Sequence, residues 1–210
     1  MQETALDALI LVDIQNDFLP GGALAVARGD EVIPVANVLA ARAPLVVATQ
    51  DWHPRGHGSF ASSHPGRKVG EVIDLNGLPQ VLWPDHCVQG SRGAEFAPSL
   101  DRSRIAAVFP KGEDPSVDSY SGFFDNGRRH ATGLSAWLKG RGVDRVFVMG
   151  LATDYCVAAT AIDAAGEGFK TVLVIDGCRG VELRPGDCAR AVDRMVAAGV
   201  SVVQSGEAGL

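Results

Sequence analysis

Short runs of apolar residues recur along the chain, and most of them are separated by segments with helical periodicity. The runs are apolar throughout and do not alternate with polar residues, which is typical of strands covered on both faces of a sheet. We expect strands at residues 8–12, 45–49, 105–109, 145–149, 171–175 and 200–203, and helices near residues 30–42, 129–141, 156–167 and 187–198. This order predicts an α/β fold, a single doubly wound, mainly parallel sheet of about six strands with helices on both faces.

The segment from about residue 51 to 104 breaks this rhythm. It is rich in Gly, Pro, His and Ser and is far longer than an ordinary connection between elements, which indicates a functional insertion. There is no low-complexity tract and no internal repeat. We therefore expect one domain over residues 1–210, with a loop-rich insertion at about 51–104.

Composition narrows the class of protein. The 210 residues are 46% hydrophobic and 21% charged, as in ordinary globular proteins, and the net charge of −6 argues against nucleic acid or an anionic membrane as partner. The acidic N-terminus lacks a basic signal region, no apolar stretch reaches membrane-spanning length, and the four cysteines form no CxxC pair. We expect a soluble cytoplasmic protein with free thiols, either a monomer or a homo-oligomer.

Three residues in the insertion have the chemistry of a metal centre. Asp51 and His53 directly follow the apolar run at 45–49, and His86 lies in a Pro-rich loop. Residues at i and i+2 share a face of an extended segment, so Asp51 and His53 can point into one cleft. Two nitrogens and one oxygen leave coordination positions open for water or substrate, and they suit zinc, iron or manganese.

Asp13, Lys111 and Cys156 follow three of the expected strands. Taken singly, they are readily explained as a turn residue, a solvated lysine and a small buried hydrophobe. In a parallel sheet, however, they leave their strands at one edge, together with the candidate metal ligands. A helix N-terminus and a nearby ammonium would lower the pKa of the thiol, and Asp13 could take its proton. The set supplies a nucleophile, a base and a cation.

Several motifs occur in the order found in one family of hydrolases. They are residues 12–18, 51–54, 57–61, 82–90, 93–96, 111–112, 118–126 and 150–157. In these motifs the chain resembles the nicotinamidases, also called pyrazinamidases, of the isochorismatase-like cysteine hydrolases. The resemblance runs from about residue 8 to the end of the chain.

The resemblance implies a role for each matching position. By this resemblance, the catalytic triad is Asp13, Lys111 and Cys156, and the metal ligands are Asp51, His53 and His86. The wall of an aromatic pocket is formed by Phe18, Trp83 and Tyr120. The backbone N–H groups of Ala152 and Cys156 form an oxyanion hole beside a cis peptide bond at Leu151–Ala152. Core packing is an equally good explanation for Phe18. His57 is expected beside the metal ligands and not among them. Asp17 is expected to order the loop after the first strand.

The implied activity is that of a metal-dependent cysteine amidohydrolase. It would convert nicotinamide to nicotinate and ammonia, and pyrazinamide to pyrazinoate, for NAD salvage, with zinc as the expected metal ion and iron or manganese as alternatives. Another amidase of the family, such as N-carbamoylsarcosine amidase, is a second hypothesis. A non-haem iron oxygenase with two histidines and one carboxylate is a third, although it would need neither Cys156 nor Lys111. A nucleotide-binding module is disfavoured because no Gly-x-Gly-x-x-Gly or Walker loop is present.

Overall fold

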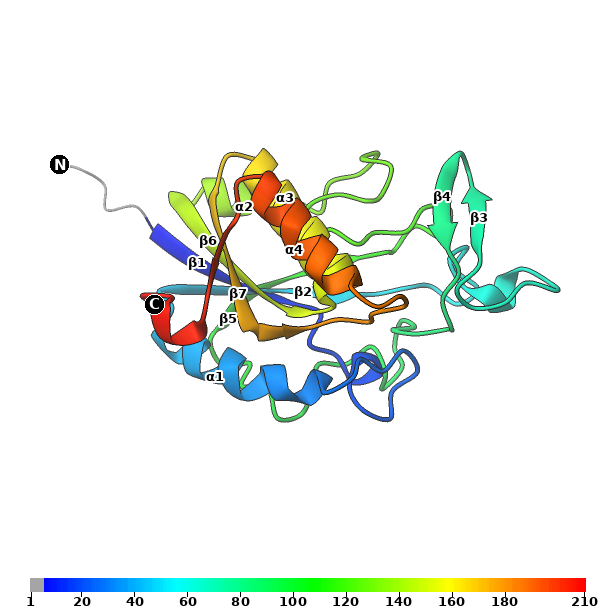
Figure 1. Ribbon diagram of the computed structural model, residues 1–210, viewed down its shortest axis with the longest axis horizontal. Coiled ribbons are helices and arrows are strands. Elements are labelled where there is room, and N and C mark those ends of the chain that lie inside the picture. The colour runs from blue at the N-terminus through cyan, green and yellow to red at the C-terminus, as the bar shows by residue number, and fades with distance from the viewer. Residues whose placement is uncertain (1–5) are drawn as a thin grey trace.

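A computed structural model describes residues 6–210 of the protein (Figure 1). Its centre is a six-stranded sheet in the order β5-β2-β1-β6-β7-β8, in which every neighbouring pair is parallel. The strands are β1 (Leu6–Val12), β2 (Leu45–Asp51), β5 (Ile105–Lys111), β6 (Val143–Leu151), β7 (Lys170–Arg179) and β8 (Ser201–Val203). The predicted fold class and all six predicted strands are confirmed.

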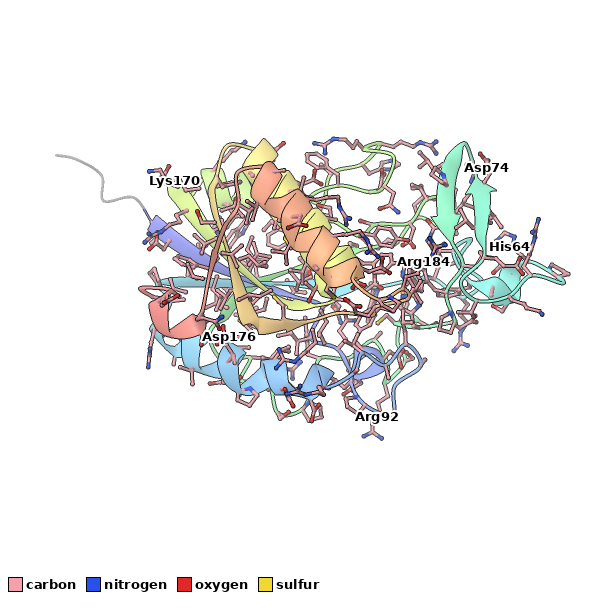
Figure 2. All side chains as sticks on the ribbon, viewed as in Figure 1. His64, Asp74, Arg92, Lys170, Asp176 and Arg184 are labelled. Atoms are coloured by element: carbon pink, nitrogen blue, oxygen red, sulfur yellow. The ribbon has the colours of Figure 1, made fainter. Side chains whose placement is uncertain are left out.

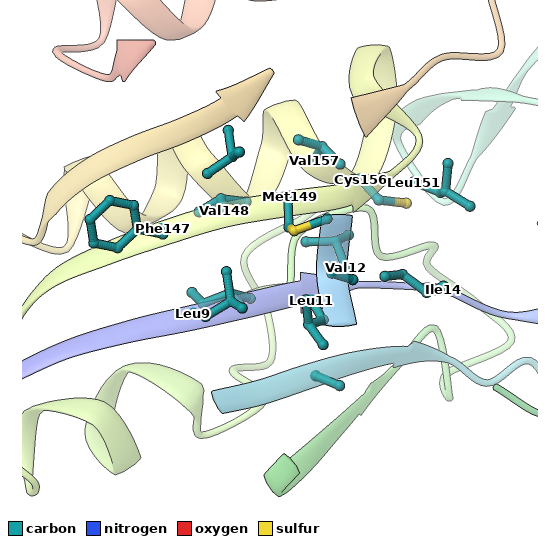
Figure 3. Close-up of a cluster of buried hydrophobic side chains, with 14 of the residues drawn as sticks. Leu9, Leu11, Val12, Ile14, Phe147, Val148, Met149, Leu151, Cys156 and Val157 are labelled. Carbon is teal, nitrogen blue, oxygen red and sulfur yellow. The ribbon is translucent and has the colours of Figure 1, made fainter. Parts of the chain in front are cut away.

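Helices cover both faces of the sheet, as the sequence predicts. One face carries α1 (Val32–Arg42), and the other carries α2 (Leu134–Lys139), α3 (Ala158–Gly166) and α4 (Asp187–Ala197) (Figure 1). In α1 the residues at positions 32, 33, 36, 39 and 40 are buried, which is the stripe that a helix lying on a sheet presents. Figure 3 shows the resulting core, in which Leu9 and Leu11 of β1 lie beside Phe147 and Met149 of β6.

Two helix predictions need correction. The helix expected at 129–141 begins only at Leu134, because Gly133 has φ +91° and Thr132 accepts the N–H of Leu134 through Oγ1 at 3.2 Å. The helix expected to open at Cys156 is preceded by a π-helical turn over Thr153–Val157, so Cys156 lies inside that turn and α3 starts at Ala158. A left-handed glycine therefore moved the start of α2, and a wider backbone turn moved the start of α3.

The segment at 51–104 contains a hairpin that the sequence analysis missed. Strands β3 (Val72–Leu75) and β4 (Leu78–Val81) pair antiparallel and stand apart from the main sheet (Figure 1). Asn76 and Gly77, with φ of +52° and +87°, form the turn between them. An Asn-Gly pair between short strands is a strong hairpin signal. The prediction of one domain with a metal-binding insertion stays a prediction.

Within residues 6–210, none of the helices has both the length and the apolar character needed to cross a lipid bilayer.

Candidate active site

The carboxyl ends of four neighbouring strands meet at one edge of the sheet. Asp51 and Lys111 are the last residues of β2 and β5 and pair with each other in the sheet register, while Asp13 directly follows β1. Strand β6 ends at Leu151, next to the turn that carries Cys156 (Figure 3). Because β1 lies between β2 and β6, the strand order reverses here, which is where ligands bind in open α/β sheets.

Lys111 stands at the centre of a buried charge cluster. Its Nζ lies 2.9 Å from Asp13 Oδ2, 3.0 Å from Asp51 Oδ1 and 3.4 Å from Cys156 Sγ. It also donates a hydrogen bond of 2.9 Å to the carbonyl oxygen of Ser119. The expected nucleophile, base and cation are therefore in contact, and Asp51 joins them to the predicted metal site.

The carboxylate of Asp13 has one fixed and one available oxygen. Its Oδ1 accepts a 2.6 Å hydrogen bond from Thr49 Oγ1, a residue that the sequence analysis missed. Among the described residues, Asp13 Oδ2 is the one buried side-chain polar atom without a well-formed hydrogen bond, although it lies beside the Lys111 ammonium. It can therefore still accept a proton.

The expected low pKa of the nucleophile is wrong for this arrangement. Burial raises the pKa of the Cys156 thiol well above its ordinary value; the charge of Lys111 lowers it, and the charges of Asp13 and Asp51 raise it further. Burial likewise raises the pKa of Asp13, against the charge of Lys111. For Lys111 the two carboxylates and the thiol outweigh burial and raise its pKa well above the ordinary range, so it stays an ammonium. The resting site thus holds a thiol and a cation.

Asp51, His53 and His86 form the cluster that the sequence predicts for a metal ion. Asp51 Oδ2 lies 3.1 Å from His53 Nε2 and 3.2 Å from His86 Nε2, and all three residues are buried. Ligand atoms bound at about 2.0–2.1 Å to one tetrahedral or octahedral ion are separated by roughly 3 Å, so the spacing fits a divalent cation.

Contacts behind the rings orient both histidines. The Nδ1 atom of His53 lies 2.9 Å from the carbonyl oxygen of Gly112, and that of His86 lies 2.8 Å from the carbonyl oxygen of Pro84. Such contacts place the N–H on Nδ1 and leave Nε2 free to bind a metal. Burial alone would lower the pKa of His53, but the charge of Asp51 raises it to about 9. A bound cation would replace the proton held between these two side chains.

The backbone of Asp51 is held by Gln15, another residue missed from the sequence. Gln15 Oε1 accepts the Asp51 N–H at 2.8 Å, and Gln15 Nε2 donates to the Asp51 carbonyl oxygen at 2.8 Å. Asp17 behaves as predicted, because its carboxylate accepts the N–H groups of Ala23 and Cys87 and so ties the loop after β1 to the residue next to His86.

His57 lies behind His53, with ring centroids 4.4 Å apart. Its Nδ1 contacts Ser59 Oγ at 2.8 Å, and its Nε2 contacts the carbonyl oxygen of Asp114 at 2.8 Å. Both ring nitrogens are therefore engaged, although His57, His53 and Asp118 are close enough to resemble a second cluster of ligands. The geometry favours a supporting position over metal ligation.

A narrow pocket with about 350 Å³ of space, part of it open to solvent, connects the two clusters. The predicted side chains Phe18, Trp83 and Tyr120 line it together with Ala152, Cys156 and the metal cluster. Both explanations considered for Phe18 hold, because it lines the pocket and is also part of the hydrophobic core. The peptide bond between Leu151 and Ala152 is cis.

Leu24, Asp118, Ser119, Tyr155 and Val181 also line the pocket and were not predicted. Asp118 and Tyr155 lie within motifs that carried the family resemblance, so that signal could have found them. Val181 follows β7 in a loop without any pattern of its own.

The Isochorismatase domain family model matches residues 7–207 of the chain. The chain belongs to the isochorismatase family. Among the relatives in this family, a nicotinamidase of Escherichia coli (strain K12) is 55% identical over 199 residues, which cover 93% of each protein.

Solved structures of isochorismatase-family relatives share the fold. A nicotinamidase and pyrazinamidase of Acinetobacter baumanii has a TM-score of 0.94 at 46% identity, over 98% of this chain and 99% of that one. PnC1 of L. infantum in complex with nicotinate has a TM-score of 0.84 at 38% identity, over 97% and 95%. The pyrazinamidase of Pyrococcus horikoshii in complex with zinc has a TM-score of 0.77 at 40% identity, over 94% and 98%.

Proposed function

We propose that this isochorismatase-family hydrolase is a nicotinamidase, which converts nicotinamide and water to nicotinate and ammonia and also hydrolyses pyrazinamide to pyrazinoate. The observation that carries the proposal is the contact of Lys111 with Asp13, Asp51 and Cys156, because Asp51 and Cys156 also line the aromatic pocket. The 55% identity to a nicotinamidase over nearly the whole chain supports the same substrate.

Cys156 is the proposed nucleophile and Asp13 its base. The thiol proton passes to Asp13 Oδ2 as sulfur bonds to the amide carbon, and the carbonyl oxygen becomes an oxyanion between the N–H groups of Ala152 and Cys156. Asp13 then gives its proton to the leaving nitrogen, and ammonia departs from a thioester. A water molecule next loses a proton to Asp13 and attacks the thioester, and the returning proton restores the thiol as nicotinate leaves.

Lys111 keeps its charge through this cycle. It faces Asp13, Asp51 and Cys156 at 2.9–3.4 Å, so it stabilises whichever of the carboxylate and the sulfur is negative. The high pKa of Asp13, which burial causes, suits a group that must hold a proton between two steps.

Asp51, His53 and His86 would hold a divalent metal ion, and zinc is the proposed one because two imidazoles and a carboxylate suit it and a zinc complex is known for the Pyrococcus relative. When bound, the ion supplies an open coordination position that can hold a pyridine nitrogen. The chain's own contribution to ring binding is a slot, the part of the pocket that Phe18, Trp83 and Tyr120 line.

The proposal is tested by measuring ammonia and nicotinate released from nicotinamide by the purified, zinc-loaded protein. Stoichiometric release of both is expected, with parallel release of pyrazinoate from pyrazinamide. An elemental analysis of the same sample should find about one metal ion per chain. Turnover of N-carbamoylsarcosine without turnover of nicotinamide would contradict the proposal.

The other hypotheses explain less of the site. An oxygenase would have no use for a buried Lys111–Cys156 pair next to the histidines. A role in NAD salvage follows from the proposed product. We also propose the cytoplasm as the location, because all four cysteines are free thiols, as expected in a reducing compartment.

A further inference from the structure

The β3–β4 hairpin buries one residue, and that residue is polar. Gln80 is 2% exposed, whereas Leu78 and Val81 on β4 are only partly buried and Pro79 is exposed. Asp74 on the other strand points outwards (Figure 2). A buried amide costs free energy unless its polar atoms are hydrogen-bonded. The partners of Gln80 therefore indicate why a glutamine occupies this position.

Two of those partners belong to the pocket wall. The two N–H groups of Gln80 Nε2 face three acceptors, Asp118 Oδ2 at 3.0 Å, the Tyr120 hydroxyl at 3.1 Å and the carbonyl oxygen of Val81 at 2.8 Å, so at least one N–H group is shared between two of them. Asp118 and Tyr120 both line the pocket, and Gln80 does not. Gln80 thus hydrogen-bonds to two residues of the pocket wall from outside the pocket.

The Tyr120 hydroxyl receives a second donor, Trp83 Nε1, at 3.2 Å. Two N–H groups converging on one oxygen fix where the end of the phenol ring lies. The rings of Trp83 and Tyr120 also pack edge-on against Tyr155, with centroids 4.8 and 5.4 Å apart. A shift of Tyr120 would therefore disturb the other two rings.

Asp118 is held in a similar way. Its Oδ1 accepts the N–H of Ser119 at 2.7 Å and its Oδ2 accepts from Gln80, so both oxygens are oriented. Oδ1 lies 3.9 Å from His53 Nε2, on the metal side of the pocket. Within residues 6–210, Gln80 is the one side chain that hydrogen-bonds to both the aromatic wall and this carboxylate.

We propose that Gln80 is a positioning residue through which the β3–β4 hairpin sets the substrate selectivity of the pocket. By holding Tyr120 and Asp118 from behind, it fixes the width of the slot for a flat six-membered heteroaromatic amide. This inference rests on the proposed nicotinamidase activity, because its substrate is the one that the slot accepts.

The test compares Gln80→Met, which keeps the length but removes both N–H donors, with Asn76→Gly in the same hairpin. Asn76 Nδ2 donates to the Ser116 carbonyl oxygen at 2.8 Å, away from the pocket, and glycine tolerates the φ of +52° there. Gln80→Met should raise KM for nicotinamide about tenfold with little change in kcat, as expected when one or two buried hydrogen bonds that place the ring are lost. Asn76→Gly should leave KM within about twofold of the parent.

A binding measurement and a double-mutant cycle separate positioning from general loosening. The Kd of nicotinate for the zinc-loaded protein, measured by calorimetry, should rise in parallel with KM. If Gln80 acts through the Tyr120 hydroxyl, Gln80→Met combined with Tyr120→Phe should weaken binding by less than the product of the two single effects. Gln80→Glu, which has the same size but accepts in place of donating, should weaken binding as well and serves if Gln80→Met does not fold.

Two results would overturn the inference: equal KM and Kd for the parent, Gln80→Met and Gln80→Glu, or fully independent effects in the cycle. A parent protein that releases no ammonia from nicotinamide would instead refute the proposed activity. The nicotinate Kd values of the variants would then still decide whether Gln80 shapes the pocket.

Discussion

The groups proposed to act on the reacting bond and those proposed to hold the ring are held by differently built regions. Asp51 and Lys111 pair with each other at the ends of β2 and β5, and Asp13 directly follows the end of β1, so the sheet places all three. Trp83 and Tyr120 come from segments outside the main sheet, and side-chain hydrogen bonds to the Tyr120 hydroxyl hold their rings. The contrast indicates that the chemistry depends on the sheet register, whereas ring recognition can change through a few loop residues without disturbing the triad.

Loss of the nucleophile should have the largest effect. Cys156→Ala should lower kcat for nicotinamide more than about 1,000-fold, because no other group can form the acyl intermediate. The Kd of nicotinate should change little, since the sulfur is a small part of the pocket. A single-turnover assay by rapid quench measures the loss of turnover, and calorimetry measures the Kd of nicotinate. Activity within about tenfold of the parent would remove Cys156 from the proposed role.

Loss of the Lys111 ammonium should destabilise the edge of the sheet and also impair the reaction. Lys111→Met leaves two buried carboxylates without their common counterion and should lower the free energy of unfolding by about 3–5 kcal/mol, measured by urea denaturation. The exposed pair of Lys139 with Glu167 provides a matched control, because Lys139→Met should cost less than about 1 kcal/mol. Equal losses for the two variants would show that the buried cluster does not stabilise the strand ends.

Removing the metal tests whether it belongs to ring recognition. His86→Ala, or chelation of the parent, should raise KM for nicotinamide about 100-fold with a smaller change in kcat, because an interaction made equally in ground and transition states affects KM. Benzamide, which lacks the ring nitrogen, should be a poor substrate of the parent, and loss of the metal should change its KM less than that of nicotinamide. If kcat collapses equally for both amides, the metal serves the hydrolytic water and belongs with the triad.

The smallest effect is expected in the loop after β7. Val181→Ala removes two methyl groups from the pocket wall and should raise KM about three- to tenfold while kcat stays near the parent value. Leu183→Ala, in the same loop but 46% exposed, is the control and should change neither constant. A lower kcat in Val181→Ala would mean that this wall also positions the reacting amide.

The difference between residues at the strand ends and residues in loops also explains what the sequence predicted. Apolar runs report burial in a parallel sheet, so the six strands and the residues that end them, Asp13, Asp51 and Lys111, could be placed from pattern alone. Thr49 could have been found as well, because it lies two residues before Asp51 and shares its face of β2.

Other features depend on contacts between distant segments. Gln80 looks like an ordinary exposed hairpin residue until Asp118 and Tyr120 are brought beside it. The pKa of Cys156 was predicted in the wrong direction because a sequence shows the neighbouring helix turn and Lys111 but not how deeply the thiol is buried.

Asp51 uses its two oxygens in different places, Oδ1 towards Lys111 and Oδ2 towards the histidines. This shared carboxylate limits how the enzyme can diverge. A descendant that lost the proposed metal site through loss of a histidine would still need an anion beside Lys111. A change of Asp51 itself would remove a proposed metal ligand and a partner of the Lys111 ammonium in one step. Among descendants, Asp51 should therefore be retained more often than either histidine.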